Sequence, residues 1–136
     1  MKRNISIALA GVTLLITPVL FTGCKKYDEG PSLSLRTKKA RVANEWKVDF
    51  AYDYKDGENT TSDYFGETWE FSKDGEWIER DNGTIDKSGT WEFVSDKESI
   101  KITKPFDVDY YDILKLKNKE MWLKDQDEEL HLVPAN

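Results

Sequence analysis

The sequence predicts an all-β protein, an eight-stranded antiparallel up-and-down meander barrel, and three observations lead to this prediction. Runs of alternating polar and apolar residues follow one another from Asn44 onward, about every 12 residues, a spacing typical of sandwiches and barrels. Asp-Gly and Asn-Gly pairs, the strongest short-range hairpin signal, separate several of these runs. The tetrapeptide Thr-Trp-Glu-Phe occurs at residues 68–71 and again at 90–93, as expected for a meander that repeats one aromatic strand.

The elements follow from this pattern in chain order. A short helix is expected over residues 36–43, before the first strand. Eight strands are then expected, at residues 46–54, 64–72, 76–81, 84–94, 99–103, 110–117, 120–124 and 129–133. Closure of the barrel would pair residues 130–133 with residues 46–50 and would remove the exposed edges that promote aggregation.

The alternation also predicts which side chains face the interior. In the last strands three pairs of apolar residues share a face: Leu114 and Leu116, Met121 and Leu123, Leu130 and Leu132. The hairpin at Asp74-Gly75 allows two registers, because a two-residue turn sets Phe71 opposite Ile78 and a three-residue loop sets it opposite Trp77. The Lys-Asp-Gly sequence favours the longer loop, with Gly75 left-handed and Trp77 inside.

The first 23 residues are expected to be a signal peptide that is removed. Lys2 and Arg3 precede an uncharged, mostly apolar run, residues 5–20, which is too short and wrongly flanked for a spanning helix. The run ends in Leu-Phe-Thr-Gly-Cys, which resembles a bacterial lipobox. Cys24 is the single cysteine of the chain, and a thioether lipid with fatty acyl chains such as palmitate would explain it. The alternative is an ordinary free cysteine beside an ordinary cleavage site.

These features divide the chain into a lipoprotein signal peptide (1–23), a lipidated cysteine with a flexible tether (24–43) and a barrel domain (44–136). Removal of the signal peptide takes away Lys2 and Arg3, so 18 of the 20 basic residues remain against 26 acidic ones, a net charge of about −8. This charge repels nucleic acid and anionic lipid headgroups, and neither is an expected partner. The expected contact with the membrane is the lipid anchor at Cys24.

The chain resembles the lipocalin-like lipoproteins of Bacteroidetes. The resemblance rests on Trp46 in the first strand, on TWEFSKDGEW and SGTWEF, and on the C-terminal segment YYDILKLKNKEMWLKDQDEELHLVP, and it covers roughly residues 40–136. It implies an eight-stranded barrel, small-molecule binding, and a Trp46 that plugs the closed end of the barrel. For most bacterial members it implies no established activity. The chain departs from the usual Gly-x-Trp of lipocalins, because it has Asn44-Glu45-Trp46.

Familiar catalytic and metal sites lack their parts, so no enzyme, metal or cofactor is expected. One histidine, one lipidated cysteine and no Gly-x-Ser-x-Gly motif exclude a nucleophilic triad and a His/Cys metal site. His131 alternates out of phase with its leucine neighbours and is expected to face solvent. An EF-hand at residues 52–63 fails, because tyrosines would occupy the first two ligand positions. A carboxylate pair among the 26 acidic residues is the remaining enzymatic alternative.

The aromatic residues leave two interpretations open. In the first, side chains fill the barrel, which acts as a docking module for an envelope protein or a glycan through exposed aromatics of residues 52–64 and of Tyr110-Tyr111. In the second, an apolar pocket binds a small apolar or amphipathic molecule, with Glu79 near its rim. The candidate ligand-binding residues are Trp69, Phe71, Trp77, Trp91, Phe93, Asp112, Leu114 and Trp122.

The residues after the lipobox predict the location. Lys25 follows Cys24 where an aspartate would signal retention in the inner membrane, so the expected site is the outer membrane. Asp28-Glu29 is similar to the acidic export signals of Bacteroidetes surface lipoproteins, which favours exposure on the cell surface.

Overall fold

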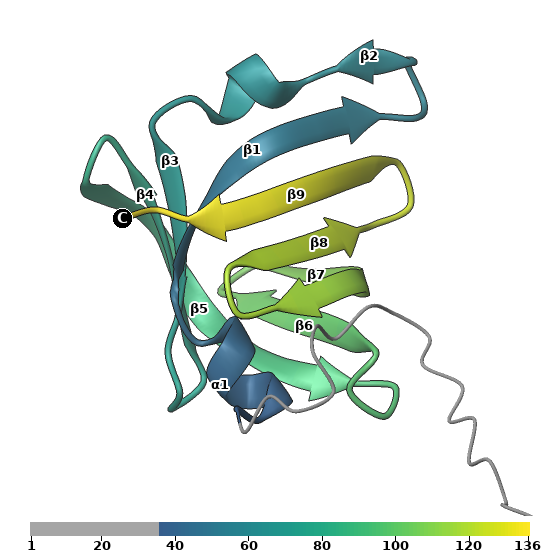
Figure 1. Ribbon diagram of the computed structural model, residues 1–136. Helices are drawn as coiled ribbons and strands as arrows, with labels where there is room; N and C mark the ends of the chain where they lie inside the picture. Colours follow the sequence, from purple (N-terminus) through teal and green to yellow (C-terminus); the bar gives the residue numbers. More distant parts are fainter. Residues whose placement is uncertain (1–35) are drawn as a thin grey trace, which may run out of the picture.

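A computed structural model describes residues 36–136, which form one closed antiparallel barrel (Figure 1). The predicted signal peptide, Cys24 and most of the predicted tether lie outside the described residues. The strands are β1 (Glu45–Asp53), β2 (Glu58–Asn59), β3 (Glu67–Phe71), β4 (Glu76–Asp81), β5 (Thr84–Val94), β6 (Ser99–Lys104), β7 (Asp107–Lys117), β8 (Glu120–Lys124) and β9 (Glu128–Pro134). Two short helices accompany them, α1 (Lys38–Val42) and the 3-10 helix η1 (Thr61–Tyr64).

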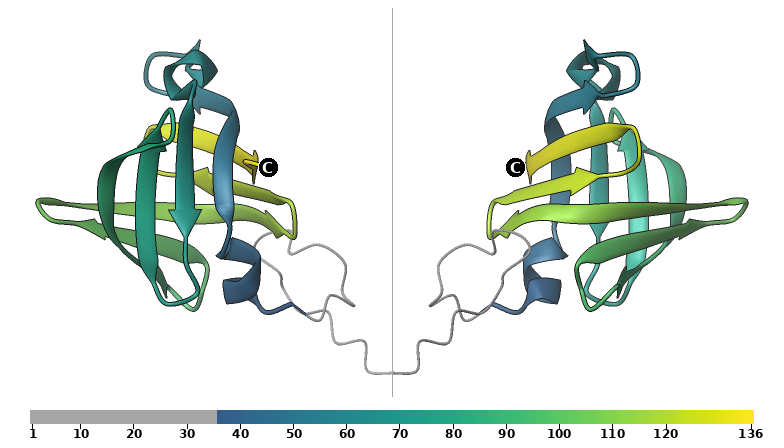
Figure 2. Two further views of the ribbon diagram at one scale, coloured as in Figure 1. Left: turned by 90° about the vertical axis from the view of Figure 1, so that its left-hand side faces the viewer. Right: turned by 90° about the vertical axis from the view of Figure 1, so that its right-hand side faces the viewer.

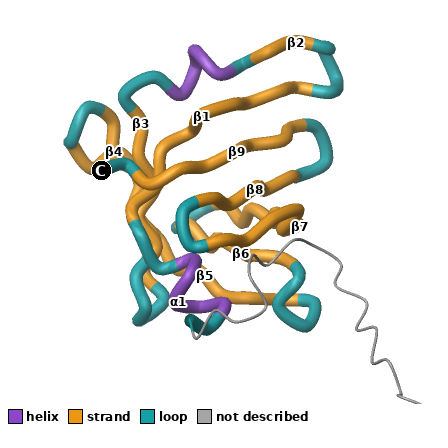
Figure 3. Tube along the Cα trace, viewed as in Figure 1, coloured by secondary structure: helices purple, strands orange, loops and turns teal. Residues whose placement is uncertain are grey.

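The predicted all-β meander is confirmed. The strands pair in the order β2-β1-β3-β4-β5-β6-β7-β8-β9, and β1 also pairs with β9, which closes the barrel. Lys47 lies opposite Val133 and Val48 opposite Leu132, as the expected closure requires. The eight predicted runs correspond to β1 and β3–β9, and the two-residue β2 is an addition that pairs with the end of β1. Short loops connect consecutive strands from β3 to β9, and a longer segment that contains β2 and η1 connects β1 to β3 (Figure 3).

The helix α1 lies at the end of the barrel where β1 begins (Figures 1 and 2). Thr37 caps it, because its hydroxyl accepts a hydrogen bond from the Ala40 N–H at 3.1 Å. Val42 is fully buried and belongs to the core, so a segment that the sequence assigns to the tether contributes to the folded domain. Within residues 36–136, no helix is long and apolar enough to cross a membrane.

The turns adopt the geometry that their residues favour. Phe71 lies opposite Trp77, and Gly75 has φ = 93°, so the three-residue loop and the inward Trp77 are confirmed. Asn82 and Gly83 both have positive φ, 48° and 82°, as a type I′ hairpin turn requires.

One predicted face is wrong. A register shift between Ile113 and Lys115 places a β-bulge in β7, and the extra residue interrupts the alternation. Ile113 and Leu116 are therefore the buried residues of this strand, and Leu114 is only half-buried. The pairs in β8 and β9 do share the interior face, since Met121, Leu123, Leu130 and Leu132 are at most 1% exposed.

Candidate functional site at the open end of the barrel

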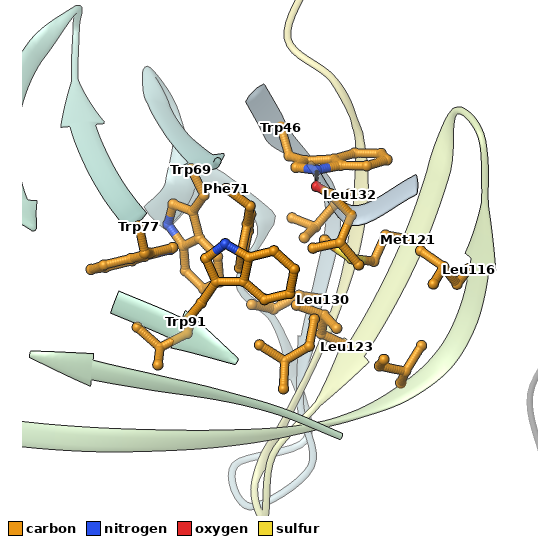
Figure 4. Close-up of a cluster of buried hydrophobic side chains, with 14 of the residues drawn as sticks. Trp46, Trp69, Phe71, Trp77, Trp91, Leu116, Met121, Leu123, Leu130 and Leu132 are labelled. Carbon is orange, nitrogen blue, oxygen red and sulfur yellow. Dashed lines mark hydrogen bonds between the residues drawn. The ribbon is translucent and has the colours of Figure 1, made fainter. Parts of the chain in front are cut away.

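Side chains fill the interior in two halves (Figure 4). Strands β3–β5 contribute an aromatic half: Trp69, Phe71, Trp77 and Trp91. Strands β7–β9 contribute an aliphatic half: Ile113, Leu116, Met121, Leu123, Leu130 and Leu132. The rings meet edge-to-face, with centroids 5.8 Å apart for Trp69 and Trp77 and 5.6 Å apart for Phe71 and Trp91. Such contacts stabilise the core by about 0.5–1.5 kcal/mol each beyond burial.

The structure brings together five of the predicted ligand-binding residues. Trp69, Phe71, Trp77 and Trp91 are at most 5% exposed, and Phe93 packs against the same core, with its ring centroid 5.3 Å from that of Trp91. These five residues form one continuous aromatic cluster. The Nε1 atom of Trp77 is buried, and no acceptor within residues 36–136 bonds to it.

The structure does not bring the other three residues into this cluster. Asp112 is exposed, and its Oδ1 accepts a hydrogen bond from the Ser99 hydroxyl at 2.8 Å. Leu114 lies at the bulge. Trp122 alternates with the buried Met121 and Leu123, so it lies on the outer face.

On the outer face Trp122 stacks on His131, with centroids 3.8 Å apart and planes at 4°. His131 is half-buried by this contact, and its Nε2 lies 2.7 Å from Glu129 Oε1. The expected outward direction of His131 is confirmed, but the ring lies flat against the sheet.

Trp46 is fully buried at the end of the barrel that α1 occupies. Its Nε1 donates a hydrogen bond of 2.8 Å to the carbonyl oxygen of Val42, which is the last residue of α1 (Figure 4). The helix and the tryptophan thus cover this end together. The opposite end, where β3, β5, β7 and β9 begin, is not covered by α1, and we call it the open end.

Five half-buried or buried polar residues gather at the open end, and we call them the mouth cluster: Tyr64, Glu67, Glu79, Tyr111 and Glu128. Glu67 alternates in phase with Trp69, Glu79 with Trp77, and Glu128 with Leu130, so their side chains face inward. Tyr111 forms part of the floor, with its ring centroid 5.8 Å from that of Trp69. Tyr64 reaches the cluster from η1.

Hydrogen bonds fix the mouth cluster. The Tyr64 hydroxyl donates to Glu128 Oε2 at 2.6 Å, and Trp69 Nε1 donates to Glu67 Oε1 at 2.5 Å. Glu79 is 7% exposed, and Lys87 Nζ lies 2.6 Å from its Oε1. The three donors come from three elements, Tyr64 from η1, Trp69 from β3 and Lys87 from β5.

The site is partly desolvated and negatively charged. Burial raises the pKa of Glu67, and nearby Glu79 adds to this, although Trp69 and Lys87 oppose it. Burial is also the main cause that raises the pKa of Tyr64 and of Tyr111, and Glu128 adds to both. Both tyrosines therefore stay protonated at neutral pH, and the proton of the Tyr64 hydroxyl is donated to Glu128.

Sequence reasoning identified Glu79 but missed the other members of the mouth cluster. Glu67 and Glu128 each stand two residues before a predicted interior residue, and that spacing was a usable signal. Tyr111 was expected to be exposed beside Tyr110, but only Tyr110 is exposed, at 58%. Tyr64 was expected to begin the strand at residues 64–72, out of phase with Trp69, but it lies on η1 and reaches the mouth from there.

Two hollows lie on the outside of the barrel. One of about 510 Å³ lies between β4, β5 and the end of β6, and one of about 450 Å³ lies between β5 and the β6–β7 hairpin. Among the residues that the structure describes, no group of three or more His, Cys, Asp and Glu side chains is arranged to hold a metal ion.

No protein-family model matches the chain, and no curated protein matches it significantly. Two solved structures share its fold. A lipocalin-like protein from Bacteroides uniformis matches 69% of this chain and 98% of its own, with a TM-score of 0.56 and 14% identity. An uncharacterized protein from Bacteroides eggerthii matches 69% of this chain and 99% of its own, with a TM-score of 0.56 and 14% identity. The chain therefore has the lipocalin-like barrel fold seen in these Bacteroides proteins.

Proposed function

We propose that this protein is a lipid-anchored binding protein of the cell envelope, which holds a small amphipathic molecule at the open end of its barrel. The observation that carries the proposal is the mouth cluster, where tyrosines and carboxylates converge over the aromatic floor of Trp69 and Tyr111. Binding sites for small molecules typically combine apolar walls with a few placed polar groups. The proposal assigns binding, and no catalysis, to this site.

The chemistry of the mouth cluster selects the ligand. The aromatic floor takes the apolar part, and Tyr64 and Tyr111 offer hydroxyl groups to the polar part. Glu67, Glu79 and Glu128 face inward, and Lys87 already contacts Glu79, so an anionic head is disfavoured and a neutral or cationic head fits. Because side chains fill the deeper interior, the ligand lies near the mouth and is small.

Native mass spectrometry tests this proposal directly. The full protein, purified from the membranes of its own host, is expected to retain a small molecule. The double variant Tyr64→Phe, Tyr111→Phe is expected to lose that mass, because it lacks both hydroxyl groups. Tyr110→Phe is the matched control, since Tyr110 is exposed and lies outside the cluster. A wild-type protein that carries no ligand, or a ligand retained equally by all variants, contradicts the proposal.

The proposed location is the outer membrane, with the barrel on a lipid tether. Its support is the lipobox-like segment that ends at Cys24, and Asp28-Glu29 supports display on the cell surface. Cys24→Ala is expected to move the protein from the membrane fraction to the soluble fraction, and a variant that stays bound contradicts the anchor. Protease treatment of whole cells is expected to digest the barrel, and an intact barrel would argue against surface display.

A further inference from the structure

The strand β5 is paired on both sides along only part of its length. Its second half pairs with β6 from Thr90 to Val94, but residues 84–89 pair with β4 alone. All residues from Thr84 to Ser88 are exposed. Residues 84–89 therefore form a free sheet edge on the side of β5 that faces away from β4.

Gly89 marks the point where β5 and β6 separate. A Cβ atom at Gly89 would lie 2.1 Å from the Thr103 carbonyl oxygen, so β6 crosses very close to the backbone of β5 here. Beyond this point the β6–β7 hairpin extends sideways past the other strands (Figure 2). The separation leaves space beside the free edge.

Both outer hollows occupy that space. Ser88, Lys104 and Pro105 line each of them, so one wall is the free edge and the other is the hairpin. The hollows are about 510 Å³ and 450 Å³ in volume, and apolar atoms of Ile78 and Phe106 contribute to their walls. Phe106 is fully exposed at the tip of the hairpin.

At the free edge, the backbone groups of Ser88 point away from β4. The Trp91 N–H donates to the Gly75 carbonyl at 2.9 Å, which is on the β4 side. Because the backbone groups of successive residues point to opposite sides of a strand, the N–H and C=O of Ser88 point away from β4. The groups that complement such an edge are those of another extended backbone.

We propose that residues 84–89 of β5 bind an extended segment of a partner protein, which adds a strand to the sheet. The apolar walls of the hollows take side chains at alternate positions of that segment. This site is separate from the mouth cluster and independent of the ligand proposed there.

The charge of the site favours a basic segment. Three acidic residues line the hollows: Glu76, Asp86 and Asp107. The two lysines beside them are shared between acidic groups, since Lys87 lies 2.6 Å from Glu79 and 3.6 Å from Asp86, and Lys104 lies 2.6 Å from Asp109 and 3.4 Å from Asp107. Five carboxylates thus face two ammonium groups, and the site keeps a negative charge. The partner segment thus alternates apolar residues with lysine or arginine. Self-pairing of two copies about a two-fold axis at Asp86 or at Lys87 would set like charges opposite each other.

A displayed library of random dodecapeptides, selected against the detergent-solubilised full chain, supplies the probe. The recovered peptides are expected to be basic and to alternate in hydrophobicity, and their affinity is measured by fluorescence anisotropy. Ser88→Pro removes an N–H that points to the vacant side and is expected to weaken binding at least tenfold. Ser88→Ala keeps the backbone and is expected to bind as the wild type does. Circular dichroism verifies that both variants are folded.

A second measurement needs no protein variant. In an added strand, every second N–H of the peptide faces β5 and the others face solvent. N-methylation of the N–H groups that face β5 is expected to abolish binding, and N-methylation of the others is expected to leave the affinity within about twofold. Failure to recover any peptide, equal binding to Ser88→Pro, or no dependence on the methylation phase overturns the proposal.

Two further outcomes also overturn it by identifying another occupant. Slow hydrogen exchange of the Ser88 amide in the peptide-free monomer would mean that a segment of the same chain already bonds to this amide. It would assign the edge to residues 25–35. A dimer that Ser88→Pro dissociates would assign it to a second copy.

Discussion

At the scale of single residues, Trp46 links the helix to the barrel. It is fully buried, and its Nε1 donates to the carbonyl that ends α1. Trp46→Phe keeps an aromatic ring but leaves the Val42 carbonyl without this donor, and the free energy of unfolding is expected to fall by about 1–3 kcal/mol. Urea denaturation measures the change. Trp122→Phe on the outer face is the control, with an expected loss below about 1 kcal/mol, and equal losses would contradict the assigned role of Trp46.

Two glutamates are expected to change stability with pH in opposite directions. Burial raises the pKa of Glu67 above its ordinary value of 4.5. Ionisation of this group therefore opposes folding as the pH rises above 4.5. For Glu129 burial acts the same way, but hydrogen bonds from Tyr54 and His131 outweigh it and lower the pKa below 4.5. The ionised Glu129 therefore contributes stability above that pH, which is lost as the pH falls through its folded-state pKa.

Neutral substitutions separate the two cases. At pH 7, Glu67→Gln is expected to raise the free energy of unfolding, since its amide oxygen still accepts from Trp69. Glu129→Gln is expected to lower it by about 1 kcal/mol. The gain from Glu67→Gln should disappear as the pH falls below 4.5, and the loss from Glu129→Gln should disappear only as the pH falls through the lowered folded-state pKa of Glu129. Denaturation curves across this range provide the measurement, and a destabilised Glu67→Gln variant at pH 7 would show that Glu67 contributes favourably as an anion.

The candidate site shows what sequence can say about single residues. Alternation correctly predicted the inward direction of Trp69, Phe71, Trp77 and Trp91, because a half-buried strand repeats every two residues. It did not predict that their rings would fill the space between them, since packing depends on strands far apart in sequence. Tyr64 and Tyr111 belong to the mouth only because closure of the barrel brings η1 and β7, which are far apart in sequence, to the same end of the barrel.

At the scale of elements, turns were predictable and bulges were not. Asn82-Gly83 and Asp74-Gly75 require positive φ, a property of the residues themselves, so their hairpins could be predicted. The bulge at Leu114 depends on how β7 bends to meet β8, and its residues give no local signal. Because the bulge shifts the alternation by one residue, the sequence-based prediction assigned both Leu114 and Asp112 to the wrong face.

Gly89 allows a prediction about the separation of β5 and β6. Any side chain there would meet the Thr103 carbonyl oxygen at 2.1 Å, and backbone can move only by disturbing the strand pair. Gly89→Ala is expected to lower the free energy of unfolding by about 1–3 kcal/mol, measured by urea denaturation. Gly83→Ala is the comparison, since a Cβ there meets nothing within 4 Å and the cost comes from its positive φ, about 1 kcal/mol. A Gly89→Ala variant as stable as the wild type would show that β6 does not hold this close approach.

At the scale of the whole molecule, closure makes the first and last strands depend on each other. β9 pairs with β1 on one side and with β8 on the other, and it supplies the buried Leu130 and Leu132. The sequence predicted this closure because the last three strands share one apolar phase and an open meander would leave two edges exposed. The outward reach of the β6–β7 hairpin could not be predicted, because it follows from the crossing at Gly89.

A chain that ends at residue 127 tests this dependence. Loss of β9 removes two core leucines and leaves β1 and β8 with unpaired edges, so neither local turn chemistry nor the remaining core can close the sheet. We expect no cooperative unfolding transition for this chain and association at micromolar concentration, followed by circular dichroism and light scattering. A chain that begins at residue 36 keeps α1 and every strand, and its unfolding midpoint should equal that of the lipid-free protein. If the shorter chain unfolded cooperatively as a monomer, the core would reside in β3–β8, and the seam between β1 and β9 would contribute little to folding.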